Sequence, residues 1–307
     1  MSNFEGKVVV VTGAGGGLGK AHALEFARRG AKIVVNDLGG SGDGVGSGDA
    51  ADLVVEQIRE SGGEAVANKA SVADKAGAQS IIDDAMSAFG TIDVLVNNAG
   101  ILRDKSFKNM EMADWDLVLD VHLNGTAYVT KAAWPIMYEK NYGRIVLTSS
   151  VSGIYGNFGQ ANYGAAKMGM LGLMNVLCIE GLSKNIKVNV LAPAAETRLI
   201  GTIPGVDVNP DNPSEERHPQ LVTPSVLLMC DEDAPTGRVI HAGNGEFYSS
   251  AIFSNNHINL GKDVTYEELL EHKERLLDMS SSVETSGLLN LLKKHLVHCI
   301  RCCFLLL

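Results

Sequence analysis

The stretch from residue 7 to 19 restricts the fold most strongly, because a buried-strand pattern runs directly into a glycine-rich turn. It reads KVVVVTGAGGGLG. A continuous apolar run such as 7–12 is typical of a strand buried on both faces of a sheet. The next residues, from about 18 to 29, have a helical pattern that stops at Gly30. A strand, a glycine turn and a helix in this order predict the first unit of an open α/β sheet.

The same alternation continues along the chain. We expect further strands over 31–37, 64–68, 92–98, 143–150, 186–192 and 237–242, with helices between them that include 50–60 and 75–89. Strands alternating with helices predict a parallel sheet with helices on both faces. Together with right-handed crossovers and a glycine turn after the first strand, this predicts an α/β fold: a doubly wound, Rossmann-type parallel sheet of about seven strands.

We expect two parts in the chain of 307 residues. Residues 1–245 form the predicted dinucleotide-binding and catalytic domain. The alternation ends near Gly245, and residues 246–307 form a C-terminal extension that is partly helical, with an amphipathic helix over 265–279.

Composition excludes several classes of protein. The net charge of −10 leaves no electrostatic footprint for nucleic acid. We see neither a secretory signal nor an apolar stretch long enough to span a bilayer, so we expect an intracellular protein, cytoplasmic by default. The ending lacks the Ser-Lys-Leu peroxisomal signal.

The final stretch, 288–307, is rich in cysteine and apolar residues. Its His and Cys spacing fits no closed zinc pattern, so we expect no metal site. A membrane-surface helix, a partner helix and a tail without function all remain open for this stretch. It gives no firm evidence of membrane binding.

The glycine turn indicates a dinucleotide site. Gly13, Gly17 and Gly19 let the backbone turn sharply and approach a pyrophosphate, which the following helix N-terminus attracts. Asp37 ends the second predicted strand, where a carboxylate can accept hydrogen bonds from an adenosine ribose and repel a 2′-phosphate. No Lys or Arg follows directly, since residues 38–40 are Leu-Gly-Gly. The sequence therefore predicts NAD rather than NADP.

Three later groups of residues are expected at the same edge of the sheet. The turn 97–100 reads Asn-Asn-Ala-Gly, and Ser150 ends another predicted strand. The carboxyl ends of parallel strands line the ligand crevice of such a sheet. Tyr163 and Lys167 follow at i, i+4 spacing and share one helix face. A nearby ammonium favours the phenolate, so we expect Lys167 to lower the pKa of Tyr163 and make it a proton acceptor.

These motifs together resemble the short-chain dehydrogenase/reductase family over roughly residues 4–245. The resemblance implies an oxidoreductase in which Tyr163 takes the alcohol proton, Ser150 binds the substrate oxygen, Lys167 also binds the cofactor ribose, and Asn124 holds a water in the proton relay. The positions that match the family's cofactor-binding motifs are Gly13, Gly17, Leu18, Gly19, Asp37, Asn98, Ala99, Gly100, Tyr163, Lys167 and Pro193. Ala194 and Ser71 depart from the pattern, because many members have Gly and Asp there.

Longer stretches resemble one branch of this family, the (3R)-hydroxyacyl-CoA dehydrogenase unit of the peroxisomal type 2 multifunctional enzymes of β-oxidation. They include VVNDLGG (34–40), NNAGILRDKSF (97–107) and the run 143–167. This resemblance implies that NAD oxidises a (3R)-3-hydroxyacyl-CoA to the 3-oxo form. A steroid hydroxyl dehydrogenase, a 3-oxoacyl thioester reductase and a non-catalytic nucleotide-binding scaffold remain alternatives. The segment 197–220 is expected to be a mobile lid over the substrate.

The helix after Tyr163 predicts an oligomer. Residues 164–182 are apolar almost all round, so the helix needs cover on more than the side facing the sheet. In the family this helix and the one before Gly143 form a dimer interface, and we expect a homodimer or a homotetramer.

Overall fold

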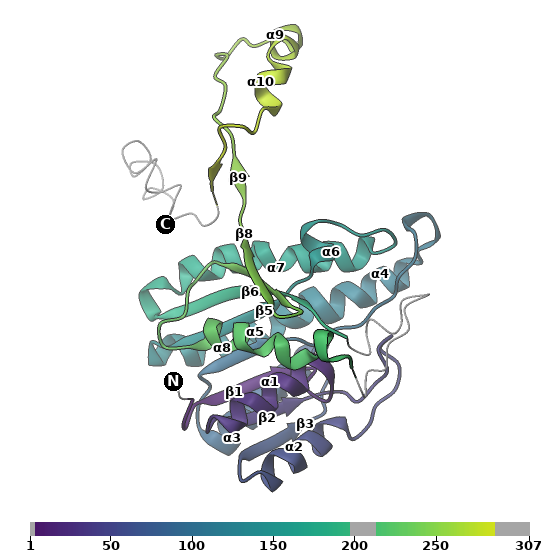
Figure 1. Cartoon of the computed structure of the whole chain (residues 1–307), viewed down its shortest axis with the longest axis vertical. Helices are drawn as coiled ribbons and strands as arrows, with labels where there is room; N and C mark the ends of the chain where they lie inside the picture. The colour runs from purple at the N-terminus through teal and green to yellow at the C-terminus, as the bar shows by residue number, and fades with distance from the viewer. Residues whose placement is uncertain (1–3, 197–212, 286–307) are drawn as a thin grey trace. The chain divides into compact units, whose positions relative to one another are not determined.

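The computed structural model of the chain describes residues 4–196 and 213–285. The chain divides into two compact units, Met1–Ser249 and Ser250–Leu307. Within the described residues, the first unit holds a main sheet of eight strands in the order β3-β2-β1-β4-β5-β6-β7-β8 (Figure 1). This order confirms the predicted doubly wound α/β fold, because the chain reverses direction across the sheet between β1 and β4.

Seven of these strands follow the predicted series. They are β1 (Val8–Thr12), β2 (Lys32–Asn36), β3 (Glu64–Asn68), β4 (Val94–Asn97), β5 (Gly143–Thr148), β6 (Ile186–Ala194) and β7 (Val239–Gly243). All their pairings are parallel, with registers such as Val10 opposite Val34 and Leu95.

The eighth strand, β8 (Glu246–Ser250), was not predicted. It pairs with β7 after a two-residue turn, Asn244-Gly245, in which both residues have positive φ, 53° and 78°. Such an Asn-Gly turn matches the twist of an antiparallel hairpin. The hairpin therefore adds an edge strand where we expected the extension to begin.

Helices cover both faces of the sheet, as predicted (Figure 1). One face packs on α1 (Gly17–Arg28), α2 (Ala50–Glu60) and α8 (Thr223–Cys230), and the other on α3 (Lys75–Phe89), α5 (Gly125–Lys140) and α7 (Ala161–Glu180). The burial of β1 on both of its faces explains why its sequence is so apolar. Val9 and Val11 enter the first core and Val8 and Val10 the second, as expected for a strand buried on both sides.

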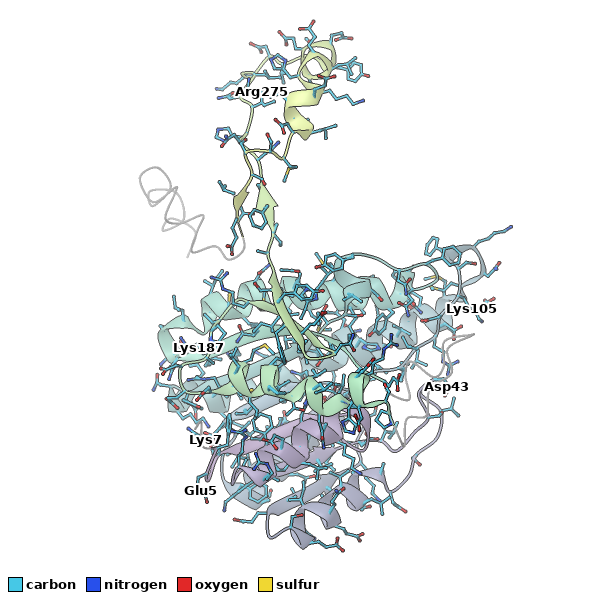
Figure 2. All side chains as sticks on the ribbon, viewed as in Figure 1. Glu5, Lys7, Asp43, Lys105, Lys187 and Arg275 are labelled. Atoms are coloured by element: carbon cyan, nitrogen blue, oxygen red, sulfur yellow. The ribbon has the colours of Figure 1, made fainter. Side chains whose placement is uncertain are left out.

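Two short helices, α4 (Met112–Leu119) and α6 (Val151–Ile154), lie at the carboxyl end of the sheet. Labelled charged residues mark the two ends of the sheet in Figure 2. Lys7 and Lys187 stand where β1 and β6 begin, whereas Asp43 and Lys105 lie on loops after β2 and β4. The candidate site lies at the carboxyl end of the strands, the end marked by Asp43 and Lys105.

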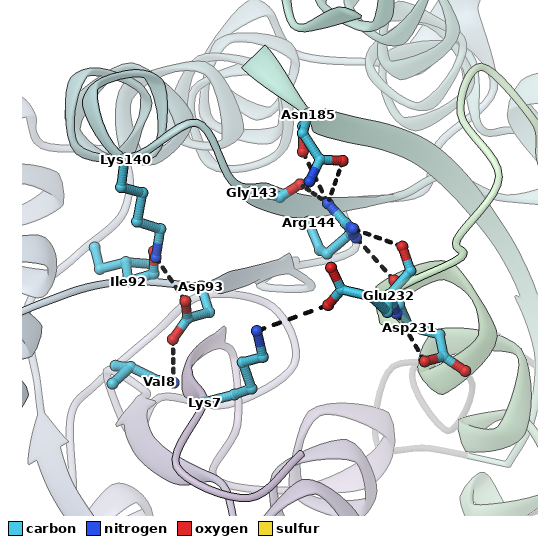
Figure 3. A network of polar contacts seen from close by, with 10 residues as sticks. All are labelled: Lys7, Val8, Ile92, Asp93, Lys140, Gly143, Arg144, Asn185, Asp231 and Glu232. Carbon is cyan, nitrogen blue, oxygen red and sulfur yellow. Dashed lines mark hydrogen bonds and ion pairs between the residues drawn. The ribbon is translucent and has the colours of Figure 1, made fainter. Parts of the chain in front are cut away.

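At the amino end of the strands, a buried guanidinium joins three elements (Figure 3). Arg144 is fully buried, and its Nε, Nη2 and Nη1 donate to the carbonyl oxygens of Asp231, Glu232 and Asn185, each at 2.8 Å. These bonds tie β5 to the chain after α8 and to the start of β6.

The second unit contains α9 (Tyr266–Glu271), α10 (Lys273–Leu277) and a small antiparallel pair, β9 (Phe253–Ser254) with β10 (Val283–Glu284). The predicted single helix over 265–279 is wrong, because it breaks at His272. Apolar side chains such as Leu270 and Leu277 are exposed there. Most helical stability in proteins comes from packing an apolar face, and neither α9 nor α10 contains a buried residue.

Candidate active site

A cavity of about 480 Å³ opens at the carboxyl ends of the strands of the main sheet. Most residues predicted for the site line it: Gly13, Gly17, Leu18, Asp37, Asn98, Ala99, Gly100, Ser150, Tyr163, Lys167 and Pro193. Gly19 and Asn124 do not. The topology brings these distant residues together because all the parallel strands end at this edge.

The glycine turn is held by the turn after β4. Asn98 Nδ2 donates to the carbonyl oxygens of Thr12 and Gly13, at 3.0 and 3.1 Å. Gly17 begins α1 with a φ of 51°. Gly19 lies behind the cavity, and a Cβ there would come within 2.2 Å of the Gly13 oxygen. Gly19 therefore lets α1 pack closely on the turn, whereas Gly13 and Gly17 face the cavity.

Asp37 follows β2 and faces the cavity beside the glycine turn. Its Oδ2 accepts from the Gly15 N–H at 2.8 Å, and its Oδ1 accepts from the Gly39 N–H at 2.7 Å. Each oxygen keeps a further lone pair. Among the described residues that line the cavity, Lys167 is the one lysine or arginine. Ser71, which stands where many members of the family have Asp, also lines the cavity.

Ser150 lies in the wall of the cavity and contacts α7 through Tyr163. It is the N-cap of α6, where its Oγ accepts from the Ser152 N–H at 3.2 Å. The Ser150 side chain is also hydrogen-bonded to Tyr163, which lowers the pKa of that phenol.

Tyr163 and Lys167 lie one turn apart on α7. Lys167 is 4% exposed, its Nζ donates to the Thr148 carbonyl oxygen at 2.6 Å, and it lies 5.5 Å from the centre of the Tyr163 ring. Burial lowers the pKa of Lys167 to about 7. The same site raises the pKa of Tyr163 to about 12, through burial first and then the Asp104 charge, while the Ser150 hydrogen bond lowers it.

The pKa of Tyr163 is raised, whereas the sequence led us to expect that it would be lowered. The expectation from the i, i+4 spacing treated Lys167 as fully charged and both side chains as exposed to water. In the protein Lys167 is buried and Tyr163 is half-buried in the wall of the cavity, so desolvation penalises the phenolate as well as the ammonium.

Asn124, which the family resemblance gives the role of holding a water, does not line the cavity. It ends a π-helical turn, Asp120–Asn124, and its Nδ2 donates to Asp120 Oδ1 at 2.7 Å. π-turns of this kind shift side chains around a helix and are frequent at functional sites. Two residues of this turn, Val121 and His122, line the cavity.

Several lining residues escaped the sequence analysis. One is His122, whose ring lies edge-to-face on Tyr163 with the ring centroids 5.1 Å apart. Gln160 donates through Nε2 to Asp104 Oδ2 at 2.6 Å. Nothing in an apolar run such as VHLNG distinguishes a histidine that faces a ligand from one that fills the core.

Tyr155 lies outside the cavity lining. It is 62% exposed and stacks on the His241 ring at 5.7 Å, so of the two tyrosines in the segment 155–167 only Tyr163 lines the cavity.

The fold and this site define the class of the protein. The family model for short chain dehydrogenases matches residues 7–200, and the chain belongs to this family. It is therefore an oxidoreductase that uses a nicotinamide nucleotide.

Particular relatives sharpen the comparison. The chain is 54% identical over 245 residues to peroxisomal multifunctional enzyme A of Dictyostelium discoideum, covering 79% of this chain and 54% of that protein. It is 45% identical over 284 residues to a protein of Mycobacterium tuberculosis named as a short-chain type dehydrogenase/reductase, covering 92% of this chain and 98% of that one. The chain thus spans about half the length of the multifunctional relative.

A solved structure with a bound ligand is also similar. It is that of 7α-hydroxysteroid dehydrogenase complexed with NADH and 7-oxo glycochenodeoxycholic acid, with a TM-score of 0.69, 28% identity, and coverage of 79% of this chain and 95% of that one.

Two negative observations concern the described residues alone. No group of three or more His, Cys, Asp or Glu side chains in them could hold a metal ion. No helix in the same part of the chain is long and apolar enough to cross a membrane. The segment 197–212 of the expected lid and the tail 288–307 lie outside the described residues.

Proposed function

We propose that the chain is an NAD-dependent dehydrogenase that oxidises a (3R)-3-hydroxyacyl-CoA to the 3-oxoacyl-CoA. The observation that carries this proposal is that Ser150, Tyr163 and Lys167 line the same cavity as the glycine turn and Asp37. Residues 1–245 are proposed to form the catalytic domain, with 246–307 as an extension.

The residues present fit a dinucleotide. Lys167 is buried, and its ammonium has three N–H donors but one hydrogen-bond acceptor among the described residues, the Thr148 oxygen. Two donors are thus left for the hydroxyls of a nicotinamide ribose. Asp37 offers carboxylate oxygens where an adenosine ribose would lie, and the described lining of the cavity places no cation beside it that would neutralise a 2′-phosphate. These features favour NAD.

NAD, when bound, would supply the hydride acceptor and a positive charge. The chain's own residues handle the proton and the position of the substrate. Ser150 holds the substrate oxygen next to the Tyr163 hydroxyl, with which it already shares a hydrogen bond. Tyr163 accepts the alcohol proton. Lys167 stabilises the charge that develops on the phenol, because it lies in the same buried site.

The thioester substrate is supported by the resemblance of the stretches 34–40, 97–107 and 143–167 to hydroxyacyl-CoA dehydrogenase units. Apolar residues, Ile101, Leu102, Leu117 and Val121, line part of the cavity and suit an acyl chain. A steroid alcohol is the second candidate, because the similar structure with a bound 7-oxo bile acid supports it.

The chain is also proposed to form a homodimer or homotetramer through α7. Ala165, Met168, Gly172 and Val176 repeat at helical spacing on one exposed side of that helix. An exposed apolar stripe of this kind is typical of a protein–protein contact. The cytoplasmic localisation expected from the sequence stays a prediction.

A substrate and cofactor panel tests the proposal. Purified protein is mixed with NAD or NADP and with (3R)-hydroxyacyl-CoA, its (3S) isomer, or bile-acid and steroid alcohols, and reduced nicotinamide is followed by absorbance. We expect turnover of the (3R) thioester with NAD, and weaker use of NADP. Preferential turnover of a steroid would replace the substrate assignment, and tighter binding of NADP would overturn the role of Asp37.

A further inference from the structure

Residues 102–105 lie between two parts of the site that are far apart in the sequence. One is the loop 38–48 after β2, which lines the cavity beside Asp37 with Leu38, Gly40, Ser41, Gly42 and Gly44. The other is the first turn of α7, which contains Tyr163. Figure 2 labels Asp43 in the loop 38–48 and Lys105 in the segment 102–105. Of residues 102–105 only Leu102 lines the cavity, so the others act on the site through their neighbours.

Two hydrogen bonds join this segment to the loop 38–48. The Leu102 N–H donates to the Gly42 carbonyl oxygen at 3.0 Å, and Arg103 Nε donates to the Asp43 carbonyl oxygen at 2.7 Å. Six of the eleven residues in the loop are glycine, the residue that loses most conformational freedom when it is ordered. The bonds from Leu102 and Arg103 therefore help to fix the loop in one conformation, and the bond from the guanidinium is the charged one of the two.

On the other side, the segment supports the start of α7. Gln160, the N-cap of α7, makes no side-chain cap hydrogen bond, although the first amides of a helix have no partner within it. The Tyr163 N–H is one of these amides, and it donates to Asn162 Oδ1 at 2.7 Å. Asn162 is fully buried, and its Nδ2 donates to the Arg103 carbonyl oxygen at 3.1 Å. The backbone of Arg103 thus holds the residue that holds Tyr163.

Two further contacts join the same segments. The Lys105 N–H donates to the Gly159 carbonyl oxygen at 2.9 Å, and Asp104 Oδ2 accepts from Gln160 Nε2 at 2.6 Å. Because these contacts fall on residues directly before Tyr163, a shift of the segment 102–105 would move the start of α7 with it.

We propose that Arg103 is a positioning residue that couples the bound nucleotide to Tyr163. Its side chain fixes the loop 38–48, and its backbone fixes Asn162 and with it the first turn of α7. A nucleotide that binds against the loop then restrains the start of α7, and by linkage an ordered start of α7 raises the affinity for the nucleotide. The inference rests on the proposed function, in which a nicotinamide nucleotide occupies the cavity and Tyr163 accepts the proton.

Three variants separate this coupling from ordinary stability. Arg103→Met keeps the apolar stem and removes the bond to the Asp43 oxygen. Arg103→Lys keeps a cation that can donate to one partner, but it lacks the fork with which Arg103 reaches both Asp43 and Asp114. Arg59→Met is the matched control, because Arg59 also donates through Nε and Nη2 to a carbonyl oxygen, that of Ala65, and does not line the cavity.

The probe is ADP, which has the adenosine half of the dinucleotide but lacks the nicotinamide ribose proposed to contact Lys167. An effect of ADP at the start of α7 must therefore pass through the protein. The readouts are the Kd of ADP by calorimetry and amide hydrogen exchange over 38–48 and 159–163, with every variant at equal occupancy by ADP. The Kd of NADH for the wild type is measured beside them.

In the wild type we expect ADP to slow exchange in both segments. In Arg103→Met the Kd of ADP should rise at least about threefold, and ADP should no longer slow exchange over 159–163. Arg103→Lys should lose part of this effect, and it carries the test if Arg103→Met does not fold. Arg59→Met should behave as the wild type.

Three results would overturn the inference. One is an Arg103→Met protein in which ADP slows exchange over 159–163 as much as in the wild type. Another is a wild type in which ADP slows exchange over 38–48 alone. The third is an equal loss of the effect in Arg59→Met, which would assign it to general stability. Failure of the proposed function is distinct from all three, because it would show as a wild-type protein that binds neither ADP nor NADH.

Discussion

Lys167 Nζ donates a hydrogen bond of 2.6 Å to the carbonyl oxygen of Thr148, and this bond fastens α7 to the end of β5. It also places a cation in a buried site, where Tyr163 lies one turn away. The bond explains how the i, i+4 pair is held. Burial lowers the pKa of Lys167 to about 7, and this makes the charge state of the site depend on pH.

The first prediction concerns stability and pH in the protein without nucleotide. The pKa of Lys167 is about 7 when folded and 10.5 as a free side chain. Between these values the unfolded chain binds a proton that the folded chain has released, so stability rises with pH in this window. The slope is at most about 1.4 kcal/mol per pH unit. Lys167→Met should remove it.

Urea unfolding at about pH 6.5 and about pH 9 measures this difference. The upper limit avoids the range above pH 10, where Tyr163, with its pKa raised to about 12, contributes a slope of the opposite sign. Equal pH slopes for the wild type and Lys167→Met would mean that Lys167 is not desolvated as described.

The second prediction concerns Gly100. Gly100→Ala would place a Cβ 2.3 Å from His122 Cε1, so the ring must move. Because His122 is packed against Tyr163, we expect kcat to fall at least about tenfold, with a smaller change in the unfolding midpoint. Normal kcat in Gly100→Ala would show that the ring can move without cost to catalysis.

The third prediction concerns the buried guanidinium at the opposite end of the sheet (Figure 3). Arg144→Met leaves the carbonyl oxygens of Asp231, Glu232 and Asn185 without their donor. Buried acceptors without partners are costly, so we expect a loss of at least about 3 kcal/mol in the free energy of unfolding. Denaturant titration measures it.

The matched control is Arg28→Met, because Arg28 makes an exposed pair with Glu25. Its unfolding midpoint should stay close to that of the wild type. A similar loss for both arginines would argue against a special role of the buried one.

The fourth prediction concerns assembly. Val176 is 52% exposed on α7, in the stripe proposed as the subunit contact. Val176→Glu should convert the oligomer to monomers in sedimentation at micromolar concentration, because the interface would bury an unpaired charge. Leu228→Glu, at a residue of α8 that is 54% exposed, is the control and should leave the oligomer intact. A wild-type monomer would contradict the proposal directly.

Much of the fold was accessible from the sequence because buried strands leave an unmistakable pattern. The helices 50–60 and 75–89 and the strand 64–68 agree with α2, α3 and β3 residue for residue. The hairpin to β8 was missed, although Asn244-Gly245 is a strong turn signal. The helix over 265–279 was predicted from its own periodicity, but continuity of a helix depends on what it packs against.

The site could be predicted less completely. Glycines and the Tyr–Lys spacing mark positions that need a particular backbone or chemistry, and the cavity gathers most of them. The direction of the Asn124 side chain depends on a π-turn that no residue pattern reveals. The contact of His122 with Tyr163 depends on how the chain folds in three dimensions. The pKa direction of Tyr163 depends on burial, which spacing alone does not give.

The central claim is that Tyr163 accepts the proton of a secondary alcohol while the cofactor binds independently of it. The most direct measurement compares wild type and Tyr163→Phe in two assays, NADH binding by fluorescence titration and single-turnover oxidation of a (3R)-hydroxyacyl-CoA with NAD. The account predicts NADH affinity within about threefold of the wild type and a loss of at least about 10³ in the oxidation rate. A Tyr163→Phe protein that oxidises the thioester at a near-normal rate would contradict it.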